Sequence, residues 1–333
     1  MNQFQQLKNP AAIYSDYKKI HGSMKQLIVN RTHPLRPFLG LIQKTRHLCQ
    51  WYLDRTAKRI SIDGAEVSFL GQLLKFPPKT GFLYSDALFW KGPEAYERET
   101  SIVIDTLLDG ADTFLDVGSN IGIYSVFAKL KYPQITVHAF EPIPDIFRKN
   151  IAFHRANGLD VTLAHNIGCG DTNTTQQIYL PCPENALEEE QTATLRPDSW
   201  QASSNEMRLI DIECVSIDQF MEGYKKQIGC CFMKIDVEDF EAAVLRGASE
   251  FITKNSPFIL CEILPREHGN VETVALVRKL GYRSFAVTRE GLFEIKGDDF
   301  NRPRSIKDFL LIPADKLDAG IHYIAFSEIK QIR

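Results

Sequence analysis

Short apolar runs alternate with amphipathic stretches over most of this 333-residue chain, from about residue 80 to residue 313. Near-continuous apolar runs are typical of strands buried on both faces, and longer amphipathic stretches are typical of helices. The alternation therefore predicts an α/β domain in which helices cover both faces of a mainly parallel sheet. The predicted strands are 113–119, 135–141, 161–168, 210–217, 228–236, 257–263, 283–288 and 308–313, and the predicted helices are 121–132, 144–158, 240–255 and 270–282.

The start of the chain differs, so we expect an N-terminal extension at 1–75 and the main domain at 76–333. Residues 18–59 hold ten Lys and Arg against a single acid, Asp54, mixed with large apolar side chains. One interpretation is a helical subdomain that packs on the core or on a second subunit of a homo-oligomer. The other is a segment that docks peripherally on an anionic membrane.

Local signals add detail to the extension. Pro34 and Pro37 interrupt any single long helix, so the basic segment is expected to form two shorter ones. The stretch 59–70 alternates apolar and polar residues around Asp63-Gly64, which predicts a hairpin with its turn there.

Composition excludes several classes of protein. A formal net charge of -3 does not suit a general nucleic-acid binder. The seven cysteines show no C-x-x-C spacing, which favours a reducing, cytoplasmic compartment over a disulfide framework or zinc site. No apolar run reaches the roughly 18 residues of a membrane-spanning helix, and the first residues do not resemble a signal peptide.

Polar residues and glycines interrupt the apolar pattern where the first predicted strand of the domain ends, at Asp116, Gly118 and Gly122. Ligands bind at the carboxyl ends of parallel strands, and glycines there let a ligand approach. Glu141 ends the next predicted strand, where an acid can accept hydrogen bonds from a ribose diol. The glycine spacing is G-x-x-x-G, so the pyrophosphate-binding pattern is incomplete, and S-adenosylmethionine suits the loop better than a dinucleotide. In the alternative interpretation, Asp116 and Ser119 only cap the following helix.

A second group of acids follows a later strand. Lys234, Asp236 and Glu238 recur with period two, so their side chains are expected to share one side of the strand end, and Glu262 ends the neighbouring strand. These three acids are candidates for a general base. Alternatively, Lys234 and Asp236 form a structural pair and Glu238 caps a helix, or His268 is the base. A cluster of three carboxylates can also hold a divalent cation, but no ligand spacing requires one, and we predict no metal site.

Six segments, in order along residues 80–313, resemble the FkbM family of S-adenosylmethionine-dependent methyltransferases. They are "YERET" (96–100), "DVGSNIGIYS" (116–125), "HAFEPIPDIFRKNIAFHRANGL" (138–159), "SIDQF" (216–220), "MKIDVEDFEAAVLRGA" (233–248) and "PFILCEI" (257–263). The family's usual Lys-Ile-Asp-Val-Glu-Gly ends in Asp239 here, so the backbone after the acids is expected to differ. Residues 1–75 match no known pattern.

The resemblance implies a class I, Rossmann-like methyltransferase fold with a seven-stranded sheet, and an O-methyltransferase that uses S-adenosylmethionine. Its acceptor would be a hydroxyl of a sugar, a glycan or another secondary metabolite. If residues 18–59 dock on a membrane, a lipid-linked sugar is the expected acceptor. Asp236, Glu238 and Glu262 would be catalytic. The expected cofactor-binding residues are Glu97, Asp116, Gly118, Ser119, Asn120, Gly122, Glu141 and Asn166. A non-catalytic S-adenosylmethionine-binding scaffold and an NAD-type oxidoreductase are the alternatives.

Overall fold

The computed structural model describes residues 64–77, 88, 96–181, 207–224, 226–264, 270–296, 306–317 and 330–331. These residues fall into two compact units. One unit contains 64–69, 75–77, 88 and 96, and the other contains 70–74 and everything described from Glu97 onward. The predicted boundary near residue 75 stays a prediction, and the basic segment 18–59 lies outside the described residues.

A nine-stranded sheet forms the centre of the larger unit, in the order β14-β12-β11-β13-β10-β9-β3-β4-β5. β5, β4, β3, β9 and β10 run parallel to one another, whereas β13 is antiparallel to both β10 and β11. The seven strands from β5 to β11 form the predicted class I sheet, and β12 and β14 extend it. The strands are β3 (Thr113–Val117), β4 (Thr136–Phe140), β5 (Ala164–His165), β9 (Cys231–Ile235), β10 (Phe258–Glu262), β11 (Tyr282–Thr288), β12 (Gly291–Ile295), β13 (Asp308–Pro313) and β14 (Lys330–Gln331).

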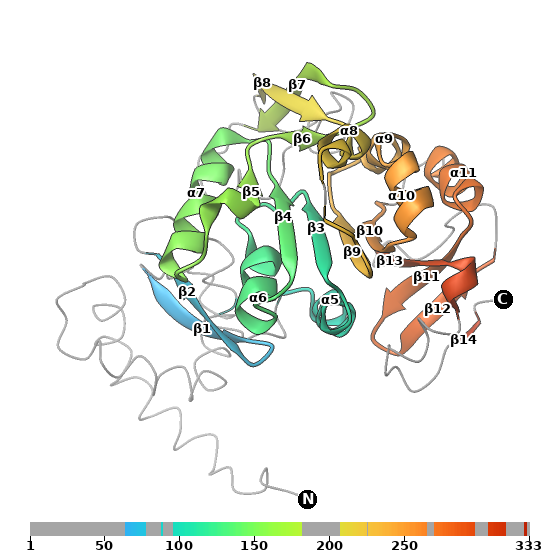
Figure 1. Ribbon diagram of the computed structural model, residues 1–333, viewed down its shortest axis with the longest axis horizontal. Coiled ribbons are helices and arrows are strands. Elements are labelled where there is room, and N and C mark those ends of the chain that lie inside the picture. The colour runs from blue at the N-terminus through green and yellow to red at the C-terminus, as the bar shows by residue number, and fades with distance from the viewer. Residues whose placement is uncertain are drawn as a thin grey trace, which may run out of the picture. The chain divides into compact units, whose positions relative to one another are not determined.

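Helices cover both faces of this sheet (Figure 1). α5, α6 and α7 lie on one side, and α8, α9, α10 and α11 lie on the other. The bounds are α5 (Arg98–Asp109), α6 (Ile123–Lys131), α7 (Pro144–Ala156), α8 (Ile217–Glu222), α9 (Glu241–Gly247), α10 (Ser249–Asn255) and α11 (Val271–Lys279). The predicted helix 240–255 is therefore interrupted at Ala248, which has the non-helical backbone angles φ -113° and ψ 9°.

Alternate residues of the central strands face opposite helical layers, because side chains alternate along a strand. Leu115 and Met233 belong to the apolar core that includes the buried side chains of α9, α10 and α11. Phe114 and Phe232 point the other way, and their rings stack at 5.1 Å between centroids. Asp116 is two residues from Phe114 in β3, so it is directed toward the layer of α5 and α6.

The predicted third strand, 161–168, is only partly confirmed. A 3₁₀ turn takes up Val161–Leu163, β5 follows with two residues, and the chain then crosses into a second sheet. That sheet has the order β6-β8-β7, with β6 (Gly168–Cys169), β7 (Thr174–Pro181) and β8 (Met207–Val215). The expected strand at 210–217 is the second half of β8 and ends at Val215, because Ser216 caps α8 through its side chain.

β1 (Ala65–Phe69) and β2 (Gln72–Phe76) form a separate two-stranded sheet. The turn between them is at Leu70 and Gly71, both with positive φ, as a two-residue hairpin turn requires. The hairpin predicted within 59–70 stays a prediction, because its first strand and Asp63 lie outside the described residues. Among the described residues, none of the helices has both the length and the apolar character needed to cross a membrane.

Candidate active site

The loop between β3 and α6 is pressed against the end of β9. Gly118 has φ +77°, and a Cβ there would lie 1.8 Å from the Asp236 backbone oxygen. The Asp236 N–H donates a hydrogen bond to the Val117 carbonyl at 3.0 Å. Only glycine combines this backbone conformation with so close an approach. The loop that carries the predicted cofactor residues is thereby fixed beside the strand that carries Asp236.

Glu141 holds the same loop from the other side. Its Oε2 atom accepts a hydrogen bond from the Asn120 N–H at 3.0 Å, and its Oε1 atom accepts one from the Ile143 N–H at 2.9 Å. Burial raises the pKa of Glu141 to about 7, although both backbone donors oppose this rise. Asn150 adds a third contact, because its Nδ2 donates to the Asn120 carbonyl at 2.8 Å. The loop is therefore shaped by side chains from β4 and α7 together.

Two predicted cofactor residues differ in their environment. Asp116 is buried, and its Oδ2 atom has no hydrogen-bond partner among the described residues. Burial raises its pKa to about 6, despite the nearby Lys234 ammonium. Asn166 is exposed and donates its amide hydrogens to the Glu141 and Pro142 carbonyls, both at 2.9 Å, so that its side-chain oxygen is the group left to face a ligand. Hydrogen bonds from the Ser125 backbone and side chain act on the Asp116 carboxyl and lower its pKa, so that Oδ2 is the acceptor atom still in need of a donor.

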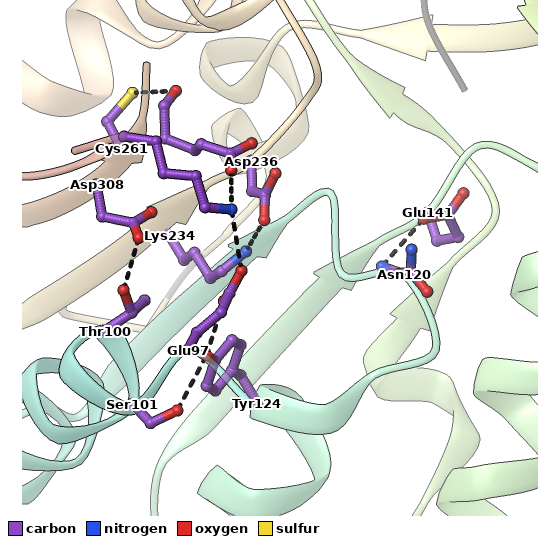
Figure 2. A network of polar contacts seen from close by, with 12 residues as sticks. Glu97, Thr100, Ser101, Asn120, Tyr124, Glu141, Lys234, Asp236, Cys261 and Asp308 are labelled. Atoms are coloured by element: carbon purple, nitrogen blue, oxygen red, sulfur yellow. Dashed lines mark hydrogen bonds and ion pairs between the residues drawn. The ribbon is translucent and has the colours of Figure 1, made fainter. Parts of the chain in front are cut away.

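Charged side chains gather beside this loop, and hydrogen bonds and ion pairs connect several of them (Figure 2). Lys234 Nζ lies 2.7 Å from Asp236 Oδ2 and 5.5 Å from the Tyr124 ring centroid. The Tyr124 hydroxyl donates to Glu97 Oε2 at 3.0 Å. We call the whole set the charged ring; its members are Lys234, Asp236, Glu262, Lys307, Glu97 and Tyr124.

Lys307 closes the charged ring. Its Nζ atom lies 3.3 Å from Glu97 Oε1 and also contacts Glu262 Oε1. Glu262 in turn is hydrogen-bonded to Asp236 through the side chains. Lys234 is therefore paired with Asp236, and Lys307 lies between Glu262 and Glu97, so that each of the two lysines neutralises part of a group of acids that would otherwise repel one another.

The carboxylates of Asp236, Glu238 and Glu262 come within 4.8 Å of one another. Burial and the Asp236 charge raise the pKa of Glu262 well above its usual range. Burial also acts to raise the pKa of Asp236, but Lys234 and the hydrogen bond from Glu262 outweigh it and lower that pKa to about 2. The charge on Asp236 therefore makes the charged form of Glu262 less favourable, as expected for two neighbouring carboxyl groups.

These acids and the β3–α6 loop lie within the part of the chain, residues 116–284, that matches the family model described as the methyltransferase FkbM domain. The chain belongs to the FkbM methyltransferase family. One relative is 31-O-demethyl-FK506 methyltransferase FkbM of Streptomyces tacrolimicus. It is 31% identical to this chain over 192 residues, which are 51% of this chain and 72% of that protein.

The chain is also similar to other known proteins. Methyltransferase 1 of Beauveria bassiana is 29% identical over 165 residues, 45% of this chain; the chain spans 65% of that protein, slightly under two thirds. Among solved structures, methyltransferase FkbM from Methylobacillus flagellatus is 14% identical, with a TM-score of 0.34 over 61% of this chain and 43% of that one.

The last two residues of the FkbM motif after β9 have a left-handed backbone. Glu238 and Asp239 have φ values of 49° and 79°. Glycine adopts such a conformation without strain, and the expected difference from the family's backbone stays a prediction. Glu97 and Asn120 also have positive φ, so that strained residues gather at this site, as they do at functional sites generally.

The alternative structural roles of the acids are only partly confirmed. Lys234 and Asp236 do form an ion pair. The N-cap of α6 is Gly122 rather than Asp116 or Ser119. The Asp116 carboxyl nevertheless interacts with the backbone N–H of Ser125 in the first turn of α6, so that the predicted capping role of Asp116 is partly supported. The N-cap of α9 is Phe240, again without such a bond, rather than Glu238. His268 lies outside the described residues.

Sequence reasoning missed three members of this FkbM site: Tyr124, Lys307 and Asp308. Tyr124 lies inside a segment whose pattern predicts a helix and nothing more. Lys307 and Asp308 precede and open β13, and the pattern alone does not tell that this strand runs antiparallel. The available signal was the charged pair at the start of an otherwise apolar run.

Proposed function

We propose that this protein transfers a methyl group from S-adenosylmethionine to a hydroxyl oxygen of a small molecule or glycan. Membership of the FkbM methyltransferase family supports methyl transfer in general. The relative from Streptomyces tacrolimicus, whose name describes a 31-O-demethyl substrate, supports oxygen as the acceptor atom.

The residues of the β3–α6 loop fit the cofactor. Asp116 offers a buried carboxylate oxygen, unpartnered among the described residues, which a hydroxyl or amino donor of a ligand would satisfy. Glu141 uses each oxygen for one backbone N–H, and each oxygen retains a lone pair for a ribose hydroxyl. Glu97 would hold the methionine end, Gly118, Ser119, Asn120 and Gly122 the loop side, and Asn166 the adenine. S-adenosylmethionine, when bound, supplies the electrophilic methyl group.

The single observation that carries the proposal is the cluster of Asp236, Glu238 and Glu262 beside the loop, whose carboxylate oxygens lie within 4.8 Å of one another. An alcohol must lose its proton as the methyl group arrives, and a positioned base contributes about 10²–10⁴-fold to such a step. Asp236 is held in its charged form by Lys234 and is 26% exposed, so that an acceptor hydroxyl can reach it. In this proposal Asp236 accepts the hydroxyl proton, and Glu262 and Glu238 position the acceptor.

Transfer of a radioactive methyl group from S-adenosylmethionine to a panel of sugars, glycans, lipid-linked glycans and small alcohols tests the proposal. Product that carries the label on oxygen is the expected result. The matched control is Asp236→Asn, which preserves size and removes the charge. Equal labelling by both proteins, or labelling of nitrogen or carbon only, would contradict the proposed reaction.

A further inference from the structure

Two neighbouring residues at the start of β13 contact the beginning of α5, which lies about 200 residues earlier in the chain. Thr100 Oγ1 donates to Asp308 Oδ2 at 2.7 Å, and Lys307 Nζ lies 3.3 Å from Glu97 Oε1. Because β13 is antiparallel to β10, its amino end lies where β10 ends. The first residues of β13 are thereby placed at the site, although they belong to no predicted motif.

Lys307 connects the two halves of the site. Glu97, on one side, is the residue expected to hold the methionine end of the cofactor, and Glu262, on the other, belongs to the acid pair. We propose that Lys307 is a positioning residue for methyl transfer, whose ammonium holds Glu97 and Glu262 in a fixed relative orientation. This role rests on the proposed function.

The charge balance supports this role. Glu97, Asp236, Glu262 and Asp308 all lie around Lys307, and Lys234 alone cannot neutralise them. Burial acts to lower the pKa of Lys307, but Glu97 and Glu262 outweigh it and raise that pKa, so the side chain is charged at any physiological pH. In the opposite direction, Lys307 lowers the pKa of both Asp236 and Glu262.

The two lysines of the charged ring differ in exposure. The Lys234 side chain is 7% exposed, whereas that of Lys307 is 40% exposed. Lys234 is therefore part of the packed interior, and its loss would unfold or distort β9. Lys307 is on the open side of the ring, so its ammonium can be removed with a smaller effect on folding.

The test compares Lys307→Met, which removes the ammonium, with Lys307→Arg, which retains a cation. Lys131→Met is the matched control, because Lys131 Nζ forms an ion pair with Asp105 Oδ1 at 2.6 Å on a similarly exposed side chain, at the end of α6 away from the acids. Each variant is assayed for thermal unfolding, for kcat and acceptor KM across pH, and for affinity toward S-adenosylhomocysteine by calorimetry.

We expect Lys307→Met to lower kcat at least tenfold and to weaken S-adenosylhomocysteine binding at least threefold. The acid limb of its pH–rate profile should move to higher pH, because the Asp236 carboxylate loses a stabilising cation. Lys307→Arg should recover most of the activity. Lys131→Met should change none of these quantities by more than about twofold. If Lys307→Met fails to fold, Lys307→Gln serves in the same comparison.

The two ways in which the inference can fail are separable. A wild-type protein that methylates no hydroxyl acceptor would overturn the proposed function, and Lys307 would then have no reaction to serve. An active wild-type protein together with a Lys307→Met variant whose kcat, pH profile and S-adenosylhomocysteine affinity match those of Lys131→Met would overturn the role of Lys307 alone.

Discussion

The backbone of Gly118 lies so close to Asp236 that a Cβ at position 118 would be 1.8 Å from the Asp236 carbonyl oxygen. The glycine therefore serves two purposes. It gives the β3–α6 loop its left-handed turn, and it lets the loop contact the backbone of the residue proposed as the base. The contact between Gly118 and Asp236 therefore holds the β3–α6 loop, which carries the predicted cofactor residues, next to the acid pair.

Gly118→Ala is expected to destabilise the fold by about 2–5 kcal/mol, since a left-handed alanine costs about 1–2 kcal/mol and overpacking typically adds about 1–3 kcal/mol. Gly158→Ala is the matched control, because Gly158 has φ +71° and a Cβ added there would meet no described atom within 4 Å. Denaturant unfolding of both variants separates the steric term from the conformational term. Equal losses for the two variants would show that the contact with Asp236 is not essential.

The backbone strain at Asp239 is expected to appear in the relative stabilities of two variants at this position. Asp239→Gly should be at least as stable as the wild type, whereas Asp239→Ala should lose about 1 kcal/mol relative to the glycine variant, because φ at this position is 79°. Denaturant midpoints measured under the same conditions give the order of stability of the three proteins. An alanine variant as stable as the glycine variant would argue against a left-handed backbone here.

Glu141→Ala is expected to weaken S-adenosylmethionine binding by about 1–3 kcal/mol, which is the usual cost of losing hydrogen bonds to a charged group. The same change should also loosen the loop, because Glu141 accepts hydrogen bonds from the Asn120 and Ile143 N–H groups. Calorimetric titration measures the affinity, and thermal unfolding confirms that the variant is folded. Unchanged affinity in a folded variant would remove Glu141 from the cofactor site.

Asp236→Asn should separate binding from chemistry. We expect its affinity for S-adenosylmethionine to stay within a few-fold of the wild-type value, and its kcat to fall by at least an order of magnitude, as loss of a base would cause. Calorimetry and the labelled-methyl assay give the two quantities. Full turnover by the folded variant would leave Asp236 with only its structural ion pair to Lys234.

Acid should weaken the fold through His138. Burial and, to a smaller extent, the adjacent His165, whose ring nitrogen lies 3.2 Å away, lower the pKa of His138 from near 6.5 to about 4. The folded state therefore favours neutral His138, and stability is lost as pH falls from 6.5 to 4 because the unfolded chain takes up the proton first. Glu141 acts oppositely, because its raised pKa favours the folded state as pH falls below 7.

The comparison that isolates this effect is the wild type against His138→Gln, since both retain Glu141. We expect the variant's free energy of unfolding to decrease less steeply between pH 6.5 and 4, whatever its value at neutral pH. Equal slopes of the free energy of unfolding against pH for the two proteins would show that protonation of His138 does not contribute to the loss of stability.

Sequence patterns located much of the site because the carboxyl ends of parallel strands meet at one edge. Asp116, Glu141, Asp236 and Glu262 each end or nearly end a predicted strand, and the parallel pairing of β3, β4, β9 and β10 brings them to that edge. Apolar periodicity was sufficient for these elements, since each is long enough to show it. The roles of the individual residues stay predictions.

Other features depend on pairing partners that are distant in the sequence. Lys307 reaches the site only because β13 runs antiparallel to β10. The direction of a strand cannot be read from a sequence of six mostly apolar residues. β5 and β6 have two residues each, too few for any period, so the pattern predicts one strand where the chain changes sheet. The hairpin turn at Leu70 and Gly71 was not predicted, because leucine is uncommon at positive φ.

β13 enters the sheet between β10 and β11, both of which precede it in the chain. During synthesis, those two strands emerge from the ribosome without the neighbour that separates them, so each exposes an unpaired edge until residues 308–313 arrive. The same segment brings Lys307 to Glu97, one of the first residues of this unit to be made. A nascent chain that already contains β3, β4, β9 and β10 therefore still lacks the contacts of Lys307 with Glu97 and Glu262, which form only after residues 307–313 have been synthesised.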